Sequence, residues 1–246
     1  MTAQPHPFFD PAQAENFKNL ATKTDSHFEI KYFGFHGLAA AARTILAAAN
    51  AKFTNVTPTD FSQEKPLVPF GLLPLLKETS ADGKITIQVS ESDAIERYLS
   101  RKFGFSGDDI FEETVINQFV SNTIGITQQV FARYVPLKEK AEKEEAKAKL
   151  IEGPLKDWAV NHEKHLIANG SNGHYVGDKT TYADIKAMSL IWLIQALTGD
   201  AVISSEKTPS ILKVKDTLEA LPGIRDWIAT KEYKAYDEAT RGFFSA

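Results

Sequence analysis

The sequence of 246 residues contains no cysteine. This absence excludes structural disulfides, zinc sites built on cysteine ligands, Cys-x-x-Cys redox pairs and cysteine nucleophiles. Any thiol that takes part in the chemistry of this protein must therefore be carried by a ligand.

The chain also has no long apolar segment and no excess of basic residues. Its most apolar stretch, residues 187–197, is too short to span a bilayer, and residues 1–10 are too polar and proline-rich for a secretory signal. The net charge of -4 argues against a nucleic-acid partner, because an acidic surface repels phosphate groups. We therefore expect a cytoplasmic protein that binds neither membranes nor nucleic acids.

Several catalytic motifs are missing as well. We find no phosphate-binding glycine loop and no nucleophile elbow. His162 and His165 stand three residues apart without a carboxylate in a metal-site pattern. We assign both histidines to an exposed helix face and expect no bound metal.

What is present is the composition of an ordinary globular protein, with 43% hydrophobic and 24% charged residues. Residues 1–26 show no sustained period and are interpreted as an N-terminal extension that wraps the surface. Alternating polarity predicts a strand over 27–33, an alanine-rich segment predicts a helix over 38–49, and β-branched residues predict a strand over 53–57. Together they predict a right-handed parallel βαβ unit.

A second group of elements follows a polar stretch. Leu75-Leu76 indicates a short buried strand, and residues 84–89 alternate clearly, so the two form an antiparallel hairpin with Asp82-Gly83 at its tip. A helix over 92–103 completes a ββα unit. Beyond residue 106 strand signals nearly vanish, and the periodicity predicts helices over 109–135, 138–158 with a bend or end at Gly153-Pro154, 183–197, 210–221 and 223–231. Gly125 is a further weak point that could allow a bend or a close contact.

Three local features in the first half could carry chemistry. If the Leu73-Pro74 bond is cis, the Leu73 backbone turns outward and can pair with an extended peptide ligand; the alternative is a trans proline that merely starts a strand. Glu91 and Ser92 at a helix start could hold the amine and carboxylate of an amino-acid head group, or Ser92 could simply cap the helix.

Tyr32 is the third feature, at the carboxyl end of the first strand. A phenol with a pKa near ~10 stays protonated at neutral pH and can donate a hydrogen bond to a nearby thiolate, which lowers the pKa of that thiol. The alternative is a tyrosine that only packs against the neighbouring helix.

These features occur in one order and spacing that resembles the N-terminal half of a cytosolic glutathione transferase, most closely the sigma class and its tyrosine-type relatives. The second half agrees more loosely, through a capping box at Thr181 and Asp184 and a late segment at 219–227. The motifs that carry the resemblance are Lys31-Tyr-Phe, His36-Gly37, Pro69-Phe-Gly-Leu-Leu-Pro74, Asp82-Gly83 and residues 91–104.

The resemblance implies a thioredoxin-like βαβ-ββα domain followed by an all-helical C-terminal domain. The implied boundaries are an extension at 1–26, a glutathione-binding domain at 27–105 and a helical domain at 106–246. It further implies a homodimer and glutathione as co-substrate. A small apolar electrophile would bind on the helical side, near the segment 109–135.

The resemblance also implies roles for individual residues. Tyr32 would be the catalytic residue, hydrogen-bonding the glutathione sulfur. Leu73, before a cis Pro74, would pair with the cysteinyl backbone. The other residues of the implied glutathione site are Phe61 and Lys65 for the glycine carboxylate, Leu72 beside the Leu-Pro step, and Glu91 and Ser92 for the γ-glutamyl end.

The chain departs from the sigma pattern at several places, among them Phe61, which stands where that class has tryptophan. His36-Gly37-Leu38 stands where Arg-Gly-Arg is common, which removes two positive charges near the sulfur, and Leu72 replaces a Gln or Lys. Asn117 stands where an aspartate reaches across the dimer to the glutathione amine. Glu91 replaces a Gln, and our hypothesis is that it supplies the charge lost at Asn117.

Three functions fit these observations. The first is a glutathione transferase that adds the thiolate to apolar electrophiles in a detoxification-type reaction, with peroxidase or isomerase activity from the same thiolate. The alternatives are a non-catalytic binding protein for glutathione or an apolar ligand, and a scaffold domain in a translation or stress complex.

Overall fold

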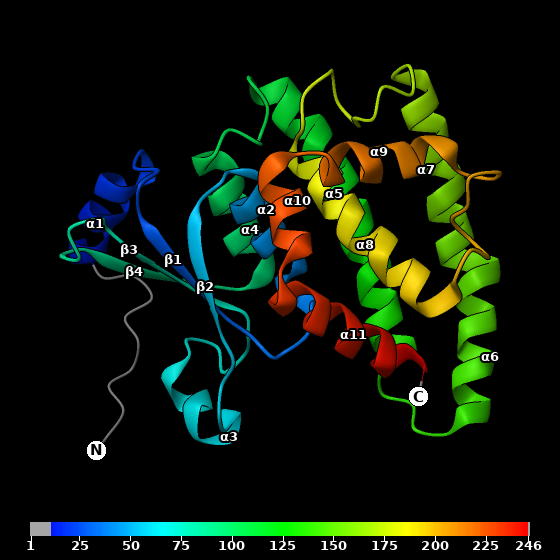
Figure 1. Ribbon diagram of the computed structural model, residues 1–246, viewed down its shortest axis with the longest axis horizontal. Helices are drawn as coiled ribbons and strands as arrows, with labels where there is room; N and C mark the ends of the chain where they lie inside the picture. The colour runs from blue at the N-terminus through cyan, green and yellow to red at the C-terminus, as the bar shows by residue number, and fades with distance from the viewer. Residues whose placement is uncertain (1–10, 246) are drawn as a thin grey trace.

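The computed structural model describes the backbone of residues 11–245 and the side chains of residues 14–244. It consists of a four-stranded sheet with flanking helices and a larger all-helical part that packs against it (Figure 1). Among the described residues, no helix has both the length and the apolar character needed to cross a membrane.

The sheet confirms the predicted βαβ and ββα units. Its strand order is β2-β1-β3-β4, with β1 parallel to β2 and antiparallel to β3, and β4 antiparallel to β3. Phe28 and Ile30 on the central strand β1 are fully buried, as the alternation of polarity requires. The strands are β1 (His27–Lys31), β2 (Lys52–Val56), β3 (Leu75–Thr79) and β4 (Thr86–Ser90).

Two helices of the first half connect the sheet to the helical part. Helix α2 (Ala40–Ala48), which follows a 3-10 turn at Gly37–Ala39, packs against both α4 (Ser92–Lys102) and α8 (Tyr182–Thr198). The alanines of α2 allow this close packing because they have little side-chain volume to separate the backbones. The short helix α3 (Phe61–Glu64) and the 3-10 turn Lys65–Leu67 lie at one end of the sheet (Figure 1).

The helical part is organised around α8, whose side chains are buried on almost all sides. This helix packs against α2, α5, α9 and α11. At its start the predicted capping box is present: the Thr181 side chain caps the helix, and Asp184 accepts from the Thr181 N–H. The helices are α5 (Ile110–Arg133), α6 (Lys140–Leu150), α7 (Lys156–Ala168), α8 (Tyr182–Thr198), α9 (Pro209–Glu219), α10 (Pro222–Ala229) and α11 (Lys231–Ser245).

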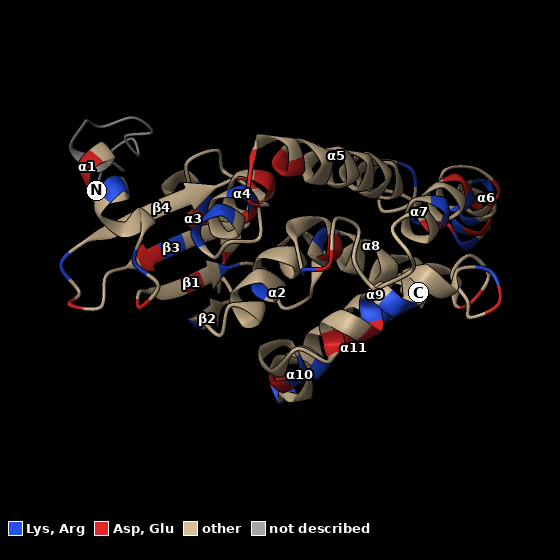
Figure 2. Ribbon diagram, turned by 90° about the horizontal axis from the view of Figure 1, so that it is seen from above, with Lys and Arg blue, Asp and Glu red and all other residues tan. Residues whose placement is uncertain are grey.

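The clearest helix irregularity among the described residues lies at the Gly153-Pro154 pair, where Gly153 has non-helical φ of -119° and ψ of -108°. α5 runs without interruption through Gly125, and a Cβ built there would have no other residue within 4 Å outside the local helix, so the expected close contact is not present. The predicted bend at Gly153-Pro154 is present as a π-helical segment, Ile151–Leu155, because Pro154 has no N–H for the helix ladder. α6, before this bend, carries charges of both signs around its surface (Figure 2).

The assignment of His162 to an exposed helix face was also wrong. Its side chain is buried, and its two ring nitrogens hydrogen-bond to the Tyr175 hydroxyl at 2.9 Å and the Asn122 amide oxygen at 3.0 Å. Burial lowers the pKa of His162 to about 3, so the ring is neutral at physiological pH. His165, three residues later, is exposed as predicted. The two polar partners lie on α5 and in the loop before α8, so local spacing could not reveal them.

The predicted N-terminal extension contains a helix that the sequence pattern did not indicate, α1 (Pro11–Ala21), which packs against β4. Leu20 is 1% exposed, and Phe17 contacts the Tyr98 ring edge-on at 6.0 Å. The Lys102 ammonium donates to the Leu20 carbonyl and pairs with buried Glu78 at 2.9 Å. Residues 1–10 of the predicted extension lie outside the described part of the chain.

Replacing Leu20 with alanine is expected to lower the free energy of unfolding by about 2–3 kcal/mol, because it leaves a cavity between α1 and the sheet. Guanidinium unfolding followed by circular dichroism measures the change. Exposed Lys18→Ala on the same helix is the control and should stay within about 0.5 kcal/mol of the parent. Equal stability of Leu20→Ala and the parent would show that α1 is not docked in solution.

Candidate active site

The register of the sheet brings the predicted site segments together. Lys31 at the end of β1 pairs with Leu75 at the start of β3, and Leu75 pairs with Ser90 at the end of β4. The residues that follow β1, precede β3 and follow β4 therefore lie at the same edge of the sheet. These are Tyr32, Leu72, Leu73, Pro74, Glu91 and Ser92.

The Tyr32 hydroxyl is held beneath the turn that follows β1. Its oxygen accepts a hydrogen bond from the Leu38 N–H at 3.1 Å, which leaves the O–H proton of the phenol to donate elsewhere. Gly37 in this turn has φ of 42°, and a Cβ at this position would lie 2.6 Å from the Tyr32 hydroxyl oxygen. Glycine is therefore required here both for the backbone conformation and for the position of the hydroxyl.

The surroundings of Tyr32 keep its phenol protonated at neutral pH. Burial raises the pKa of Tyr32, while the Leu38 N–H and the charge of Arg43 act in the opposite direction. The Arg43 guanidinium is itself 1% exposed and lies 5.8 Å from the centre of the Tyr32 ring. Burial lowers the pKa of Arg43 to about 10, so it remains charged at neutral pH.

Sequence reasoning missed Arg43. The available signal was a single arginine within an otherwise apolar, alanine-rich helix, since a charge on a buried helix face needs partners and often marks a site. Although two arginines are absent at His36 and Leu38, a positive charge remains close to Tyr32.

The Leu73-Pro74 peptide bond is cis, which is the first of the two alternatives stated above. β3 begins only at Leu75, so the Leu73 backbone lies outside the strand ladder. The Lys65 side chain runs beside this segment, because its Cε lies 3.1 Å from the position of a Cβ on Gly71. Pro74 is buried, whereas Leu72 is 58% exposed.

Phe61, at the start of α3, is joined to the same edge through aromatic contacts. Its ring meets Phe33 edge-on at 5.6 Å, and Phe33 stacks on Phe35 at 5.9 Å. Phe35 in turn contacts the Tyr32 ring at 5.4 Å. The aromatic contacts therefore connect Phe61 to the turn that holds the tyrosine hydroxyl.

Glu91 has an unusual backbone conformation for a residue with a side chain, with φ of 70° and ψ of 121°. Such conformations cost about 1–3 kcal/mol and cluster at functional sites. The Glu91 carboxylate is exposed and makes no capping hydrogen bond, and Ser92 begins α4 directly after it. Both residues are therefore available to a ligand at the N-terminus of a helix.

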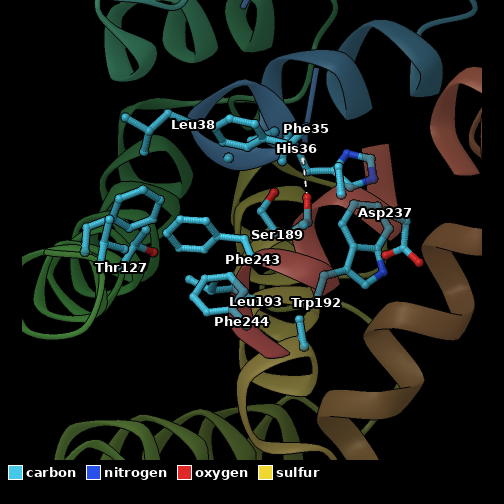
Figure 3. A pocket seen from close by; sticks show the side chains of 18 of the residues that line it. Phe35, His36, Leu38, Thr127, Ser189, Trp192, Leu193, Asp237, Phe243 and Phe244 are labelled. Atoms are coloured by element: carbon cyan, nitrogen blue, oxygen red, sulfur yellow. Dashed lines mark hydrogen bonds between the residues drawn. The ribbon is translucent and has the colours of Figure 1, made fainter. Parts of the chain in front are cut away.

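An apolar cavity of about 250 Å³ opens beside this edge, between the sheet part and the helical part (Figure 3). Leu38, whose N–H binds the Tyr32 oxygen, forms part of its wall. The remaining lining residues come mainly from helices α2, α4, α5, α8 and α11 and from the turn that follows β1. Principal lining residues are Phe35, Thr127, Phe131, Ser189, Trp192, Leu193, Thr240, Phe243 and Phe244.

The α5 residues of the cavity belong to the segment expected to face an electrophile, but α11 was missed. The predicted helices ended at residue 231, whereas α11 begins there and continues to Ser245. Its amphipathic spacing was visible in the sequence: Tyr233, Tyr236, Thr240 and Phe244 fall on one helix face, and Tyr233, Tyr236 and Phe244 are buried.

Asn117 lies apart from the cavity, half-buried on α5. It lines a separate small hollow together with Arg97 and Arg101. Arg101 pairs with Glu113 at 2.5 Å. Within a single chain, Asn117 therefore makes no contribution to the cavity beside Tyr32.

Comparison with known proteins gives a consistent result. Residues 127–231 match the family "Glutathione S-transferase, C-terminal domain". The chain is 30% identical over 211 residues to glutathione S-transferase 3 of Caenorhabditis elegans, covering 83% of this chain and 97% of that protein. Its fold matches the crystal structure of the glutathione S-transferase from Ascaris lumbricoides with a TM-score of 0.70, 28% identity and coverage of 82% and 96%.

A sigma class glutathione transferase of Fasciola hepatica shares the fold, with a TM-score of 0.71, 24% identity and coverage of 85% of this chain and 99% of that one. The molecule is thus a two-part protein with a thioredoxin-like N-terminal domain and an all-helical C-terminal domain, as predicted. It belongs to the cytosolic glutathione transferase superfamily.

Proposed function

We propose that this protein is a tyrosine-type glutathione transferase in which Tyr32 activates the thiol of glutathione. The observation that carries the proposal is the position of the Tyr32 hydroxyl. It accepts a hydrogen bond from the N–H of Leu38, and Leu38 forms part of the wall of an apolar cavity. The phenol donates its O–H to the sulfur and stabilises the thiolate after the thiol proton has left to solvent. The thiolate then attacks the electrophile, forming a carbon–sulfur bond and expelling the leaving group.

The proposed glutathione site follows the edge of the sheet. The Leu73 backbone, outside the ladder of β3, pairs with the cysteinyl unit as a short antiparallel strand. Glu91 and Ser92 hold the γ-glutamyl end at the start of α4, where free N–H groups favour the carboxylate. Lys65 and Phe61 hold the glycine end, with Leu72 beside the Leu-Pro step. These glutathione-binding roles are assigned from the family resemblance. The closeness of the residues to the same end of the sheet supports them.

We further propose that residues 27–105 form the glutathione-binding domain and residues 106–246 supply most of the electrophile site. The accessible wall of the cavity is mainly apolar, although the polar or charged residues His36, Glu96, Thr127, Lys186, Ser189, Asp237 and Thr240 also line it, so we propose a largely apolar electrophile. A cytoplasmic homodimer is part of the proposal, on the strength of the family resemblance.

Two measurements on the wild-type protein test the function. Isothermal titration calorimetry should detect glutathione binding at millimolar ligand, and an absorbance assay should detect conjugation of glutathione to 1-chloro-2,4-dinitrobenzene. Absence of both signals would overturn the proposal. Binding without turnover would instead support the alternative of a non-catalytic glutathione-binding protein.

One observation favours that alternative. Burial lowers the pKa of His36 to about 4, so the turn that holds Tyr32 carries no charge at His36 or Leu38 at neutral pH. A thiolate at this site would be stabilised by Tyr32 and, from a greater distance, by Arg43.

The charge on Glu91 provides a sharper test of the glutathione site. Glu91→Gln removes the charge that we assign to the glutathione amine and is expected to weaken glutathione affinity about threefold to tenfold, a modest change because the group is exposed to solvent. Calorimetry measures the dissociation constant. Glu139→Gln, an acidic side chain preceding α6, is a control that should leave the constant unchanged. Unaltered affinity in Glu91→Gln would rule out this role.

A further inference from the structure

We infer that the C-terminal helix α11 positions the turn that holds Tyr32, with Thr240 as the main positioning residue. We call residues 34–38 the activating turn, because it contains Leu38, whose N–H binds the Tyr32 oxygen. The inference rests on the proposed function and extends it to a helix that lies almost entirely beyond the matched residues 127–231.

The first contact is a direct hydrogen bond between the turn and the helix. The His36 N–H donates to the Thr240 hydroxyl oxygen at 3.1 Å, drawn as the dashed line at His36 in Figure 3. The same hydroxyl donates to the Tyr236 carbonyl at 2.7 Å, which fixes its orientation. An oriented acceptor on a rigid helix therefore holds the backbone two residues before Leu38.

The side chain of His36 adds a second contact. It is 6% exposed and packs between helices, with its ring centre 4.6 Å from that of Tyr233 on α11 and 5.7 Å from that of Trp192 on α8. Because the ring is neutral at physiological pH, it is buried there without an unpaired charge. The imidazole thus anchors the turn between α8 and α11.

A third contact reaches the turn from its inner side through Arg43. One guanidinium N–H donates to the Phe35 carbonyl at 2.8 Å, and the group lies 4.4 Å from the centre of the Tyr236 ring. Another N–H donates to Asn55 at 2.7 Å, and Asn55 donates to Glu232 of α11 at 3.0 Å. Phe35 is therefore held by Arg43, whose side chain contacts α11 directly and through Asn55, and His36 is held by Thr240 of α11.

The physical consequence concerns preorganisation. A hydrogen-bond donor stabilises a developing anion most when it is already aimed at the anion and need not be reoriented during reaction. If the turn loses its contact to α11, the Leu38 N–H no longer has a fixed position, and the Tyr32 hydroxyl that depends on it moves as well. The thiol pKa of bound glutathione should then rise, although the glutathione-binding residues are untouched.

The test uses Thr240→Val, which keeps the shape of the side chain but removes the acceptor for the His36 N–H. We expect the thiol pKa of bound glutathione, measured by ultraviolet absorbance of the thiolate against pH, to rise by about half a unit to one unit. Turnover at neutral pH should fall about threefold to tenfold, with the glutathione dissociation constant within twofold of the parent. Thr240→Ser restores the acceptor and should restore the thiol pKa.

Thr198→Val is the matched control, because Thr198 also donates to a carbonyl four residues earlier, at 2.8 Å, but lies at the end of α8. It should leave the thiol pKa unchanged. Thr240→Ala serves as a second variant should valine impair folding. A wild-type thiol pKa in a folded Thr240→Val or Thr240→Ala protein would overturn the inference.

The failure of the inference can be told apart from the failure of the proposed function. If Tyr32→Phe raises the thiol pKa and the Thr240 variants do not, only the role of α11 is wrong. If Tyr32→Phe itself leaves the thiol pKa unchanged, the thiol is not activated by Tyr32, and both fail.

Discussion

Tyr32→Phe is expected to lower kcat/KM for 1-chloro-2,4-dinitrobenzene about a hundredfold, while glutathione affinity stays within about threefold of the wild type. A hydrogen bond from a buried phenol to a thiolate involves a charged group and is worth about 3 kcal/mol at most. Since about 1.4 kcal/mol corresponds to one pKa unit, its loss raises the thiol pKa by about two units. The fraction of bound glutathione present as thiolate at neutral pH then falls by up to about a hundredfold, and turnover falls with it.

The substitution should change the reactivity of the sulfur but not the fold or glutathione binding, because the phenylalanine ring keeps the contacts of the tyrosine ring to Phe33 and Phe35. In a plot of log kcat/KM against pH, the rising limb should move to higher pH by the change in thiol pKa, since the reactive form is the deprotonated one. Tyr175→Phe removes a buried hydroxyl in the helical part and is the control. Turnover within threefold of wild type in Tyr32→Phe would mean that another group activates the sulfur.

The second large effect concerns a buried ion pair between the two parts of the molecule. Glu96 on α4 is 1% exposed, and its carboxylate accepts from the Lys186 ammonium on α8 at 2.7 Å and from the Tyr182 hydroxyl. Asp93 lies 3.7 Å from the same ammonium. Burial raises the pKa of Glu96, whereas Lys186 and the Tyr182 hydroxyl act to lower it.

Lys186→Met is expected to lower the free energy of unfolding at pH 7 by about 3–5 kcal/mol, because it leaves the Glu96 carboxylate buried without a cation. The pH dependence has a definite sign. Loss of Lys186 raises the pKa of Glu96 in the folded protein further above its value of about 4.3 in the unfolded chain. The protonated carboxyl therefore favours the folded state below about pH 4.3, and this stabilisation is lost as the pH rises through the folded-state pKa. The deficit should therefore be largest at neutral pH and shrink toward pH 4–5.

Guanidinium unfolding at pH 5 and pH 7 measures both effects. The double variant Lys186→Met with Glu96→Leu removes the charge as well as its partner and should recover most of the lost stability. A pH-independent deficit, or a double variant no more stable than Lys186→Met alone, would contradict the ion-pair explanation. The result would also show how strongly α4 and α8 hold the two parts of the cavity wall together.

The sequence by itself determined the elements whose signals are local. Alternating side chains identified β1 and β4, the alanine-rich run identified α2, and the Thr181–Asp184 pair identified the start of α8, because each signal depends on neighbours within a few residues. The resemblance of their order and spacing to the family, rather than any local signal alone, predicted that Tyr32, Leu73 and Ser92 belong to one site. The antiparallel pairing of β1 with β3, which joins the βαβ and ββα units and brings these residues to the same end of the sheet, was established by the structure.

Only the tertiary structure decided which distant groups surround that edge. Arg43 lies near Tyr32, and Thr240 holds His36 across 204 residues of sequence, because helix packing brings α2, α8 and α11 together. The docking of α1 on the sheet and the burial of His162 have the same origin: their partners come from other elements. Local patterns determine where a helix or strand forms, whereas the contacts that set the pKa and position of a side chain depend on how those elements pack.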